Sequence, residues 1–282
     1  MKIYELLNKA TCVLSKKNKN KKISYKESEI ILLSIINKSR DYLYRNFKNN
    51  VNKKIVIKFL KKIRKRVNGY PLQYLTGYEI FYGRKFHIYR GVFIPRSDSE
   101  TLIEALKKIK FNAPIKCIDI GSGSGCLGIT AALETTPNMD VTFIDINKNA
   151  IKNTRKNLRL YNLKAQIIYQ SFFKYILKNK QKFDIAICNP PYISYKKFKK
   201  LQKEVKFEPK NALLAEKDGY DFYIKLATSG EKFLKPKGYL IIEAGDNMAK
   251  NIKKIFSIKW NHLFSVKDYI NKERALVFQL RF

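Results

Sequence analysis

The chain of 282 residues is 45% hydrophobic and carries a formal net charge of +35. This length and apolar content exclude a disordered chain, and they leave room for one large domain with a small one, or for two moderate domains. Because no apolar run approaches the roughly 18 residues of a membrane span, and because Met1–Glu5 does not resemble the start of a secretion signal, we expect a soluble, cytoplasmic protein.

Residues 1–77 are predicted to form a small helical domain. Apolar residues recur at helical spacing in three stretches, at Ile3, Leu6, Leu7 and Ala10, at Ile30, Leu33 and Ile36, and at Ile55, Val56, Phe59 and Ile63. Ser24-Tyr25-Lys26-Glu27 has the sequence of a capping box and predicts a helix start, and Asn68-Gly69 followed by Pro71 predicts the end of the last helix. The basic residues of that helix are predicted to form a solvated face, with docking of a partner as the alternative: Lys61, Lys62, Arg64, Lys65 and Arg66.

Residues 78–95 are predicted to be a β-hairpin linker, because Tyr78–Ile88 contains two short strand patterns around a glycine turn. From residue 96 to 282, short apolar strands alternate with helix-length segments, which is typical of an α/β domain with a doubly wound, mostly parallel sheet. The predicted strands are Ile115–Ile120, Val141–Ile146, Ala165–Tyr169, Phe183–Cys188 and Tyr239–Glu243. Two further strands, around His262–Lys267 and Arg274–Leu280, follow each other without a helix and predict a closing hairpin.

A glycine-rich loop, Gly121, Ser122, Gly123, Ser124 and Gly125, follows the first of these strands. Glycines at a strand-to-helix turn let a ligand approach the backbone closely. The third glycine comes one position earlier than in the dinucleotide-binding GxGxxG pattern. Asp145 ends the second strand, where a carboxylate can accept hydrogen bonds from two ribose hydroxyls. Together with Asp119 before the loop, the pattern resembles the S-adenosylmethionine fingerprint of class I methyltransferases; a tight turn with capping acids is the alternative.

The tetrapeptide Asn189, Pro190, Pro191 and Tyr192 follows the strand Phe183–Cys188, where an open α/β sheet binds its ligands. The prolines restrict φ and hold Asn189 and Tyr192 in a fixed relation. The Asn189 oxygen and the Pro190 carbonyl can accept both hydrogens of one planar NH2 group, on which Tyr192 can stack. An amide nitrogen is a poor nucleophile that needs placement against a methyl donor and acceptors for its developing charge. The motif therefore predicts amide methylation; a proline-rich turn without catalytic role is the alternative.

Nearly the whole chain resembles the bacterial HemK/PrmC family of release factor glutamine N5-methyltransferases. Besides the two motifs above, the resemblance rests on Pro71–Gly77, Phe93–Leu102, Phe207-Glu208-Pro209, Asp268-Tyr269 and Glu273-Arg274. It implies a class I methyltransferase whose residues 1–77 recognise the substrate and whose residues 96–282 bind S-adenosyl-L-methionine. The implied partners are class I peptide chain release factors, methylated on the glutamine of their GGQ motif.

The resemblance also implies roles for individual residues. Gly121 to Gly125, Asp145 and Asn189 would hold the cofactor, while Asn189, Pro190, Pro191 and Tyr192 would grip the glutamine, the catalytic residues being Asn189, Pro190 and Tyr192. Arg96 and Glu100 would border the active-site mouth. Where the family commonly has Asp-Trp or Asp-Leu after the third strand, this chain has Phe172-Phe173. Phe172 is the residue expected to stack on the adenine.

Two other functions compete with this interpretation. An amino-directed adenine DNA or RNA methyltransferase shares Asn-Pro-Pro-Tyr, but it must extract its base from a stack, and no target-recognition domain of adequate size follows residue 190. A non-catalytic nucleic-acid-binding protein would not need the complete motifs. The positive charge has two explanations: AT-rich codon usage, or a surface that meets RNA near the ribosome. We expect neither nucleic acid as substrate nor a membrane partner.

No metal site is predicted. The four cysteines contain no CxxC pair, and the chain has only two histidines. Zinc sites and disulfide frameworks both need denser groups of these residues. The cysteines are therefore expected to be small buried hydrophobic residues in a reducing compartment.

Overall fold

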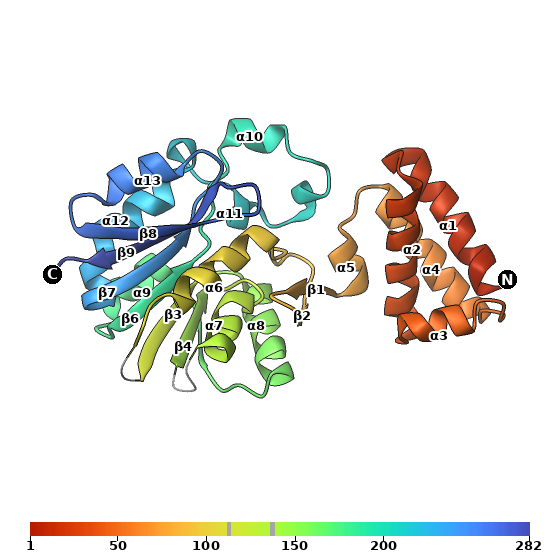
Figure 1. Cartoon of the computed structure of the whole chain (residues 1–282), viewed down its shortest axis with the longest axis horizontal. Helices are drawn as coiled ribbons and strands as arrows, with labels where there is room; N and C mark the ends of the chain where they lie inside the picture. The colour runs from red at the N-terminus through yellow and green to blue at the C-terminus, as the bar shows by residue number, and fades with distance from the viewer. Residues whose placement is uncertain (112–113, 136–138) are drawn as a thin grey trace. The chain divides into compact units, whose positions relative to one another are not determined.

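The computed structural model describes residues 1–111, 114–135 and 139–282 (Figure 1). These residues divide into two compact units. Unit 1 comprises Met1–Tyr78 with Gln202–Phe207, and unit 2 comprises Glu79–Leu201 with Glu208–Phe282. Within the described ranges, no helix has both the length and the apolar character needed to cross a membrane.

Unit 1 is helical, as the apolar stripes predict. Its helices are α1 (Ile3–Asn18), α2 (Lys21–Ile36), α3 (Arg40–Arg45), α4 (Lys53–Val67) and α5 (Leu72–Thr76), joined by the short 3-10 helix η2 (Val205–Phe207). The predicted stripes of α1 and α4 enter its core, which includes Leu6, Leu7, Ala10, Phe59 and Ile63. The predicted stripe of α2 is only partly right, because its fully buried residues are Ile31 and Leu32. Leu33 and Ile36 pack partly buried against the core, and Ile30 is only half-buried. The cluster draws its side chains from helices far apart in sequence, so the burial of these stripes stabilises the unit as a whole.

The predicted capping box at Ser24 is wrong. The helix α2 already begins at Lys21, and the side chain of Asn20 caps it by accepting a hydrogen bond from the Ile23 amide at 3.1 Å. Ser24 therefore lies inside the helix, where its hydroxyl donates to the Asn20 carbonyl at 2.9 Å. Asparagine is as good a cap as serine, so the cap one turn earlier prevails and leaves Glu27 for another partner.

The partner of Glu27 is Arg66, which was predicted to be solvated. The Arg66 side chain is only 9% exposed, and its guanidinium pairs with Glu27 and with Glu204 at 2.5 Å each. It also donates to the Tyr70 carbonyl at 3.2 Å. The prediction of a solvated face is therefore wrong for Arg66, because two acids from distant parts of the chain surround it.

Unit 2 contains a seven-stranded sheet and, apart from Tyr78, a two-stranded sheet. The strands β1 (Tyr78–Phe81) and β2 (Arg84–His87) form the small hairpin. The large sheet has the order β5-β4-β3-β6-β7-β9-β8, its strands being β3 (Ile115–Ile120), β4 (Met139–Asp145), β5 (Gln166–Tyr169), β6 (Phe183–Cys188), β7 (Leu234–Glu243), β8 (Trp260–Lys267) and β9 (Glu273–Leu280). The first five are parallel, and β9 runs antiparallel to both neighbours. This confirms the predicted doubly wound sheet with a closing hairpin.

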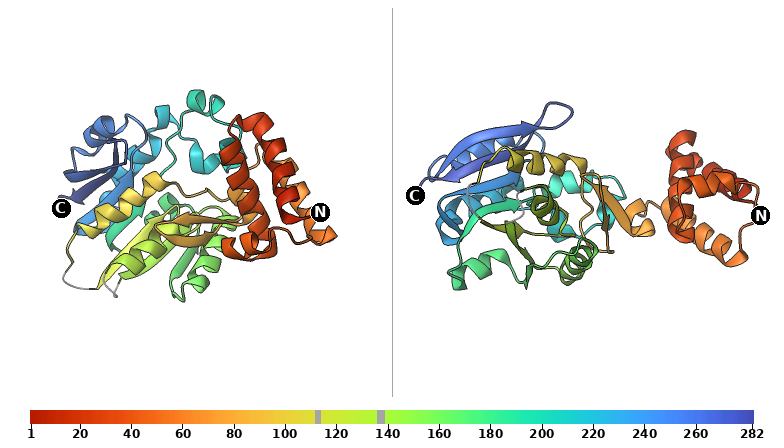
Figure 2. Two further views of the ribbon diagram at one scale, coloured as in Figure 1. Left: turned by 45° about the vertical axis from the view of Figure 1, so that its right-hand side comes forward. Right: turned by 60° about the horizontal axis from the view of Figure 1, so that its bottom comes forward.

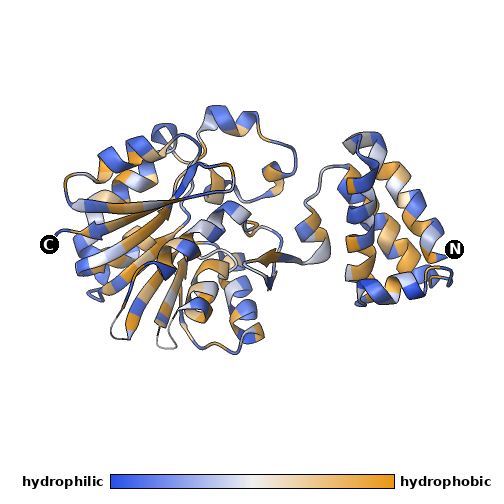
Figure 3. Ribbon diagram, viewed as in Figure 1, coloured by the Kyte–Doolittle hydropathy of each residue, from blue (hydrophilic) through white to orange (hydrophobic). Residues whose placement is uncertain are grey.

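Helices cover both faces of this sheet (Figure 2). One core contains side chains of α6 (Glu100–Lys107), α7 (Cys126–Glu134) and α8 (Lys148–Leu160). The other contains side chains of α9 (Phe172–Lys178), α12 (Asp221–Phe233) and α13 (Ala249–Phe256). Since both faces are covered, the inner strands β3, β6 and β9 are hydrophobic along most of their length (Figure 3), whereas the edge strand β8 is largely exposed. Four short segments complete the unit: α10 (Tyr195–Lys199), α11 (Lys210–Leu213), η1 (Ser97–Ser99) and η3 (Lys217–Gly219).

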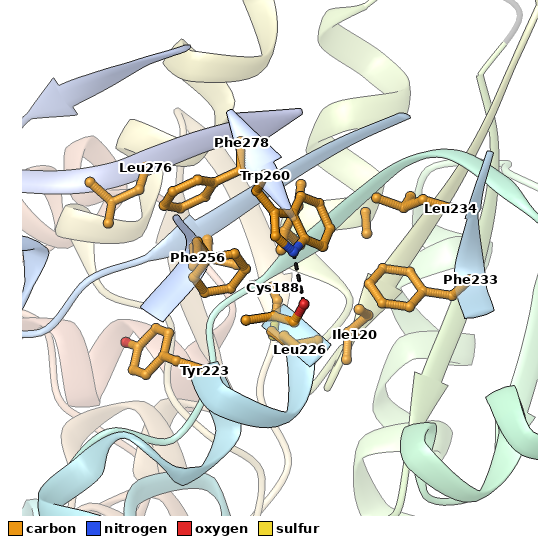
Figure 4. Packing of buried hydrophobic residues seen from close by; sticks show 14 of the residues in the cluster. Ile120, Cys188, Tyr223, Leu226, Phe233, Leu234, Phe256, Trp260, Leu276 and Phe278 are labelled. Atoms are coloured by element: carbon orange, nitrogen blue, oxygen red, sulfur yellow. Dashed lines mark hydrogen bonds between the residues drawn. The ribbon is translucent and has the colours of Figure 1, made fainter. Parts of the chain in front are cut away.

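The core on the α12 side is aromatic and fixes the end of β7. Trp260 is fully buried, and its indole nitrogen donates to the Ala227 carbonyl at 2.9 Å, while the rings of Phe256 and Phe278 stack at 4.4 Å (Figure 4). Tyr223 of α12 lies in the same cluster, and its hydroxyl donates to the backbone carbonyl of Glu243 at 2.8 Å. The Tyr223 hydroxyl thus anchors the backbone of Glu243, the last residue of β7, to this aromatic core.

The order of the strands determines where a ligand can bind. From β3 the chain goes to β4 and β5 on one side, and it returns with β6 on the other side, so that Ile120 and Cys188 pair as the last residues of β3 and β6. Such a reversal of strand order opens a crevice at the carboxyl ends of the two strands, where open α/β sheets bind ligands. Both sequence motifs follow these two strand ends.

Candidate active site

Four neighbouring strands of the sheet, in the order β4, β3, β6 and β7, end at the candidate site. Asp145 is the last residue of β4, and Gly121 comes directly after β3. Asn189 comes directly after β6, and Glu243 is the last residue of β7. Because these strands are parallel, their carboxyl ends lie at one edge of the sheet and bring the four residues there.

The glycine loop needs its glycines for two different reasons. Gly121, Gly123 and Gly125 have φ values of +72°, +58° and +79°, which side-chain-bearing residues rarely adopt. A Cβ at Gly121 would find no atom within 4 Å, and one at Gly123 only the Gly121 oxygen at 3.9 Å. At Gly125, by contrast, it would lie 3.0 Å from Thr154 of α8. The first two glycines therefore keep open space beside the backbone, and the third allows close packing.

The loop is tied to Asp145. One carboxylate oxygen of Asp145 accepts the Gly123 amide at 2.9 Å, and the other accepts the Asn147 amide at 2.7 Å. Burial raises the pKa of Asp145. The Ile146 amide also bonds to this carboxylate, so of its about four acceptor positions one remains for a hydroxyl of a ligand.

Asp119 plays a different part from Asp145. It is 1% exposed, and it accepts the Gly128 amide in the first turn of α7 at 2.9 Å. Burial, together with the charge of Asp145, raises the pKa of Asp119 to about 7. Its carboxyl group is thus held inside the protein below the loop, as a cap for the following helix.

Asn189 is half-buried, and its amide nitrogen donates to the Ser99 hydroxyl at 3.0 Å. Ser99 is the last residue of η1, and it donates in turn to the carboxylate of Glu243. Among the residues that the structure describes, none donates a hydrogen bond to the side-chain oxygen of Asn189. The amide therefore has a fixed nitrogen and a free acceptor.

Tyr192 is fixed by its hydroxyl, which donates to the other oxygen of Glu243 at 3.2 Å. Burial and the charge of Glu243 raise the pKa of Tyr192. Its ring lies against the backbone of Gly245, where a Cβ would come within 2.8 Å of the ring atom Cδ2. Because Gly245 has no side chain, the ring of Tyr192 can pack directly against its backbone.

Ser99 and Glu243 are the residues that sequence reasoning missed. Ser99 lies within the stretch Phe93–Leu102 that resembles the family, and Glu243 is an acid at the end of an apolar strand, as Asp145 is. That position was the available signal for Glu243. Its connection to Asn189 depends on β7 lying beside β6, which no local pattern indicates.

The remaining candidate residues mostly hold local structure. Arg96 pairs with the buried Glu208 and donates to the Ile94 carbonyl at 2.6 Å. Glu100 accepts the Tyr82 amide at 2.7 Å. In the described parts of the chain, no group of three or more His, Cys, Asp or Glu side chains is placed to hold a metal ion.

Phe172 lies at the start of α9 and is only 5% exposed. Its ring contacts Phe233 and Phe173 edge-on, with centroids 5.1 and 5.4 Å away. These contacts leave little ring surface for a ligand, whereas Phe173 is half-buried. Stacking of Phe172 on the adenine stays a prediction, with this burial against it.

Comparison with known proteins finds a family match for the N-terminal helical part and another for the part with the large sheet. Residues 5–77 match the family model of the PrmC N-terminal domain, and residues 85–216 match that of the methyltransferase small domain. Among solved structures, a methyltransferase from Pyrococcus furiosus superimposes with a TM-score of 0.52 at 16% identity, over 71% of this chain and 91% of that one. This likeness confirms the class I methyltransferase fold.

Two relatives are similar to this chain, and the second of them shows its family. The chain is 33% identical over 276 residues to the bifunctional methyltransferase of Rickettsia typhi, covering 90% of this chain and 52% of that protein, so it spans about half the length of such relatives. It is 31% identical over 283 residues to the release factor glutamine methyltransferase of Bacillus cereus, over 98% of both chains. The chain therefore belongs to the release factor glutamine methyltransferase family.

Proposed function

We propose that this protein transfers a methyl group from S-adenosyl-L-methionine to the N5 side-chain amide nitrogen of the glutamine in the GGQ motif of class I release factors. The observation that carries the proposal is the Asn189 amide, whose nitrogen is bound to Ser99 while its oxygen is free. It stands at the switch point of the sheet, directly after β6 and beside the glycine loop after β3.

The loop residues fit the cofactor. The open space at Gly121 and Gly123 admits a ligand against the backbone, and Asp145 has an acceptor position left for a ribose hydroxyl. Gly121, Ser122, Gly123, Ser124, Gly125 and Asp145 would hold it, with Asn189 close by. When bound, the cofactor supplies an electrophilic methyl group on a sulfonium sulfur.

The residues after β6 act on the substrate amide. Asn189, through its oxygen, and Pro190, through its carbonyl, each accept one hydrogen of the glutamine NH2 group, so that the nitrogen lone pair faces the methyl group. Pro191 keeps the turn extended, and Tyr192 lies along the plane of the amide. Placement of this kind lowers the barrier by several kcal/mol, and the two acceptors stabilise the charge that develops on nitrogen. The transfer would form one C–N bond and break the bond between the methyl carbon and the sulfonium sulfur, and one N–H proton would be released to solvent.

We further propose that residues 1–77 recognise the release factor and that residues 78–95 link them to the catalytic residues 96–282. The matching relatives are named for release factors, and the N-terminal family model belongs to the same family. Release factors act in the cytoplasm, and nucleic acid is not the methyl acceptor. The charge of +35 then acts on encounter with an acidic ribosome-bound partner rather than on chemistry.

Transfer of a labelled methyl group tests the function. Purified protein is incubated with labelled cofactor and, separately, with a release factor, with the same factor whose GGQ glutamine is alanine, with DNA, and with ribosomal RNA. We expect label only on the factor with its glutamine intact, at the side-chain amide by mass spectrometry. Label on nucleic acid instead would replace the proposal with a nucleobase methyltransferase.

Asn189 provides the sharper test of the mechanism. Asn189→Ala removes one oriented acceptor, which is commonly worth about 10²–10³ in turnover, and should lower turnover far more than cofactor affinity. Asn189→Asp keeps an acceptor but cannot donate to Ser99, and it adds a negative charge beside the sulfonium that stabilises the ground state. We expect it to bind cofactor and to lose much of the turnover. Wild-type single-turnover rates in both variants would refute the role of Asn189.

A further inference from the structure

An asparagine side chain presents an acceptor and a donor that are almost identical in shape. If the Asn189 amide turned by 180°, it would point its own NH2 at the glutamine NH2, and two donors would face each other. The acceptor role of Asn189 therefore requires that something in the protein distinguishes the two orientations. Backbone shape does not, because oxygen and nitrogen occupy the same space.

We propose that Ser99 and Glu243 are positioning residues that fix the orientation of the Asn189 amide, so that its oxygen faces the substrate. The proposal rests on the proposed function and adds two residues to its site. Neither residue touches the reacting atoms; both act through Asn189.

The hydroxyl proton of Ser99 determines which end of the Asn189 amide can bind to it. A serine hydroxyl has one proton to donate, and that of Ser99 goes to an oxygen of Glu243. Only lone pairs of the hydroxyl remain for Asn189, so it can accept from the amide nitrogen, at 3.0 Å, but cannot donate to the amide oxygen. Turning the amide would replace this hydrogen bond by two acceptors in contact.

Glu243 gives the chain of hydrogen bonds its direction. An ionised carboxylate only accepts, and both oxygens of Glu243 do so, one from Ser99 and one from Tyr192 at 3.2 Å. Its backbone is held by the Tyr223 hydroxyl at 2.8 Å. A single carboxylate thus fixes both ends of the tetrapeptide, Asn189 through Ser99 and Tyr192 directly.

Other charges around Glu243 leave it in this role. Asp98 and Arg274 lie near it, and Tyr192, Tyr223 and Cys188 are the other titratable groups that face it. Arg274 is engaged with three acids, Asp268, Asp246 and Asp98, at 2.8, 2.7 and 3.2 Å. No ion pair therefore competes for the oxygens of Glu243 in the described residues.

Protonation of Glu243 would remove the fixed direction of the hydrogen bonds that run from Asn189 through Ser99 to Glu243. Burial raises the pKa of this carboxyl to about 7, so it titrates within the range of an assay. A protonated Glu243 can donate to Ser99, whose own proton is then free to meet the Asn189 oxygen. Turnover should fall as the pH decreases through about 7, while Glu243→Gln, which has no such titration, should flatten that part of the profile.

The first experiment is a double-mutant cycle in single turnover, with Ser99→Ala, Asn189→Ala and the double variant. Loss of the orienting bond should lower the turnover of Ser99→Ala about tenfold or more, with KM and cofactor affinity nearly unchanged. In the Asn189→Ala background the same change should cost nothing, because its target is gone. Ser99→Thr keeps the hydroxyl and should restore turnover. Additive losses would overturn the proposal, since they mean that Ser99 acts without Asn189.

A second measurement does not depend on activity. With ¹⁵N-labelled asparagine, the signal of the Asn189 amide is identified by its absence in Asn189→Ala. Its exchange with water should be slow in the wild type and in Ser99→Thr, and fast in Ser99→Ala. Ser99→Ala also removes a hydrogen-bond donor from the buried Glu243 carboxylate. Glu243→Gln has the same shape without the charge and avoids this problem. In Glu243→Gln we expect the Asn189 amide to exchange faster than in the wild type.

The two measurements separate the possible failures. A wild-type protein that methylates no release factor but shows slow exchange at Asn189 refutes the proposed function and keeps the positioning role. If the wild type is active but the Asn189 amide exchanges equally fast in the wild type, Ser99→Ala and Glu243→Gln, the positioning role alone is refuted.

Discussion

Replacing Gly121 by alanine can separate backbone strain from ligand exclusion, because Gly83 offers a matched control. Gly121 has a φ of +72° and Gly83 a φ of +71°, and a Cβ at either position would have nothing within 4 Å. Gly83 lies in the turn between β1 and β2, and Gly121 lies directly after β3. The two substitutions therefore impose the same strain in different places, and only one of them is in the proposed cofactor site.

The expected magnitudes follow from this match. A side-chain-bearing residue in the left-handed region costs about 1–2 kcal/mol, and the lower entropy of the unfolded chain with alanine offsets about 0.4–1 kcal/mol of it. Each variant should therefore lose about 1 kcal/mol of unfolding free energy. For cofactor affinity the two should differ: Gly121→Ala places a methyl group in the space beside the loop, and we expect at least tenfold weaker binding, about 1.4 kcal/mol.

Urea denaturation of the ligand-free variants gives the strain, and titration calorimetry with S-adenosyl-L-methionine gives the affinity. Gly83→Ala should bind the cofactor as the wild type does. Equal affinities in the two variants would show that the space beside Gly121 is not used by the cofactor. A Gly121→Ala variant much less stable than Gly83→Ala would refute the assumption that the two substitutions impose the same strain.

Two further predictions concern stability. Arg66→Ala leaves the buried Glu27 without its partner and should destabilise unit 1 by about 3–5 kcal/mol, whereas Arg64→Ala on the exposed face of the same helix should change its stability by less than about 0.5 kcal/mol; equal midpoints in denaturant would contradict this. Folding raises the pKa of Asp119 and Glu243 to about 7, so the folded state binds more protons than the unfolded state between about pH 4.5 and 7. The unfolding free energy should therefore fall as the pH rises through that window, by about 3 kcal/mol from Glu243, and an unchanged slope in Glu243→Gln would argue against it.

The strands that flank the site were predictable because their signals are local. Ile115–Ile120 and Phe183–Cys188 have the same bounds in the sequence prediction and in the structure. In both cases a short apolar run ends at residues that cannot continue a buried strand, Gly121 after the first and Asn189-Pro190 after the second. Since both motifs follow strand ends, placing the strands was enough to place the motifs at one edge of the sheet.

The predictions that failed depend on competition or on distance. At Ser24 a good cap signal lost to an equally good one at Asn20, and the sequence contains no measure of which is stronger. Arg66 lies among exposed basic residues, so a charge pattern alone predicts solvent. Its burial depends on Glu204, which is 138 positions away in the chain and packs in the same unit. The ligand-binding roles of the glycine loop and of Asn189 to Tyr192 stay predictions.

Glu243 is the residue whose presence most needs a functional reason. A carboxyl group that is 2% exposed, without a cation bound to its oxygens in the described part of the chain, destabilises the protein at neutral pH. An apolar residue at the end of β7 would avoid that cost, because the surrounding core is hydrophobic. Groups with strongly shifted pKa values are concentrated at functional sites. Here the acceptor that only a carboxylate supplies is what aligns Ser99, and through it Asn189, so the lost stability and the required orientation have the same origin.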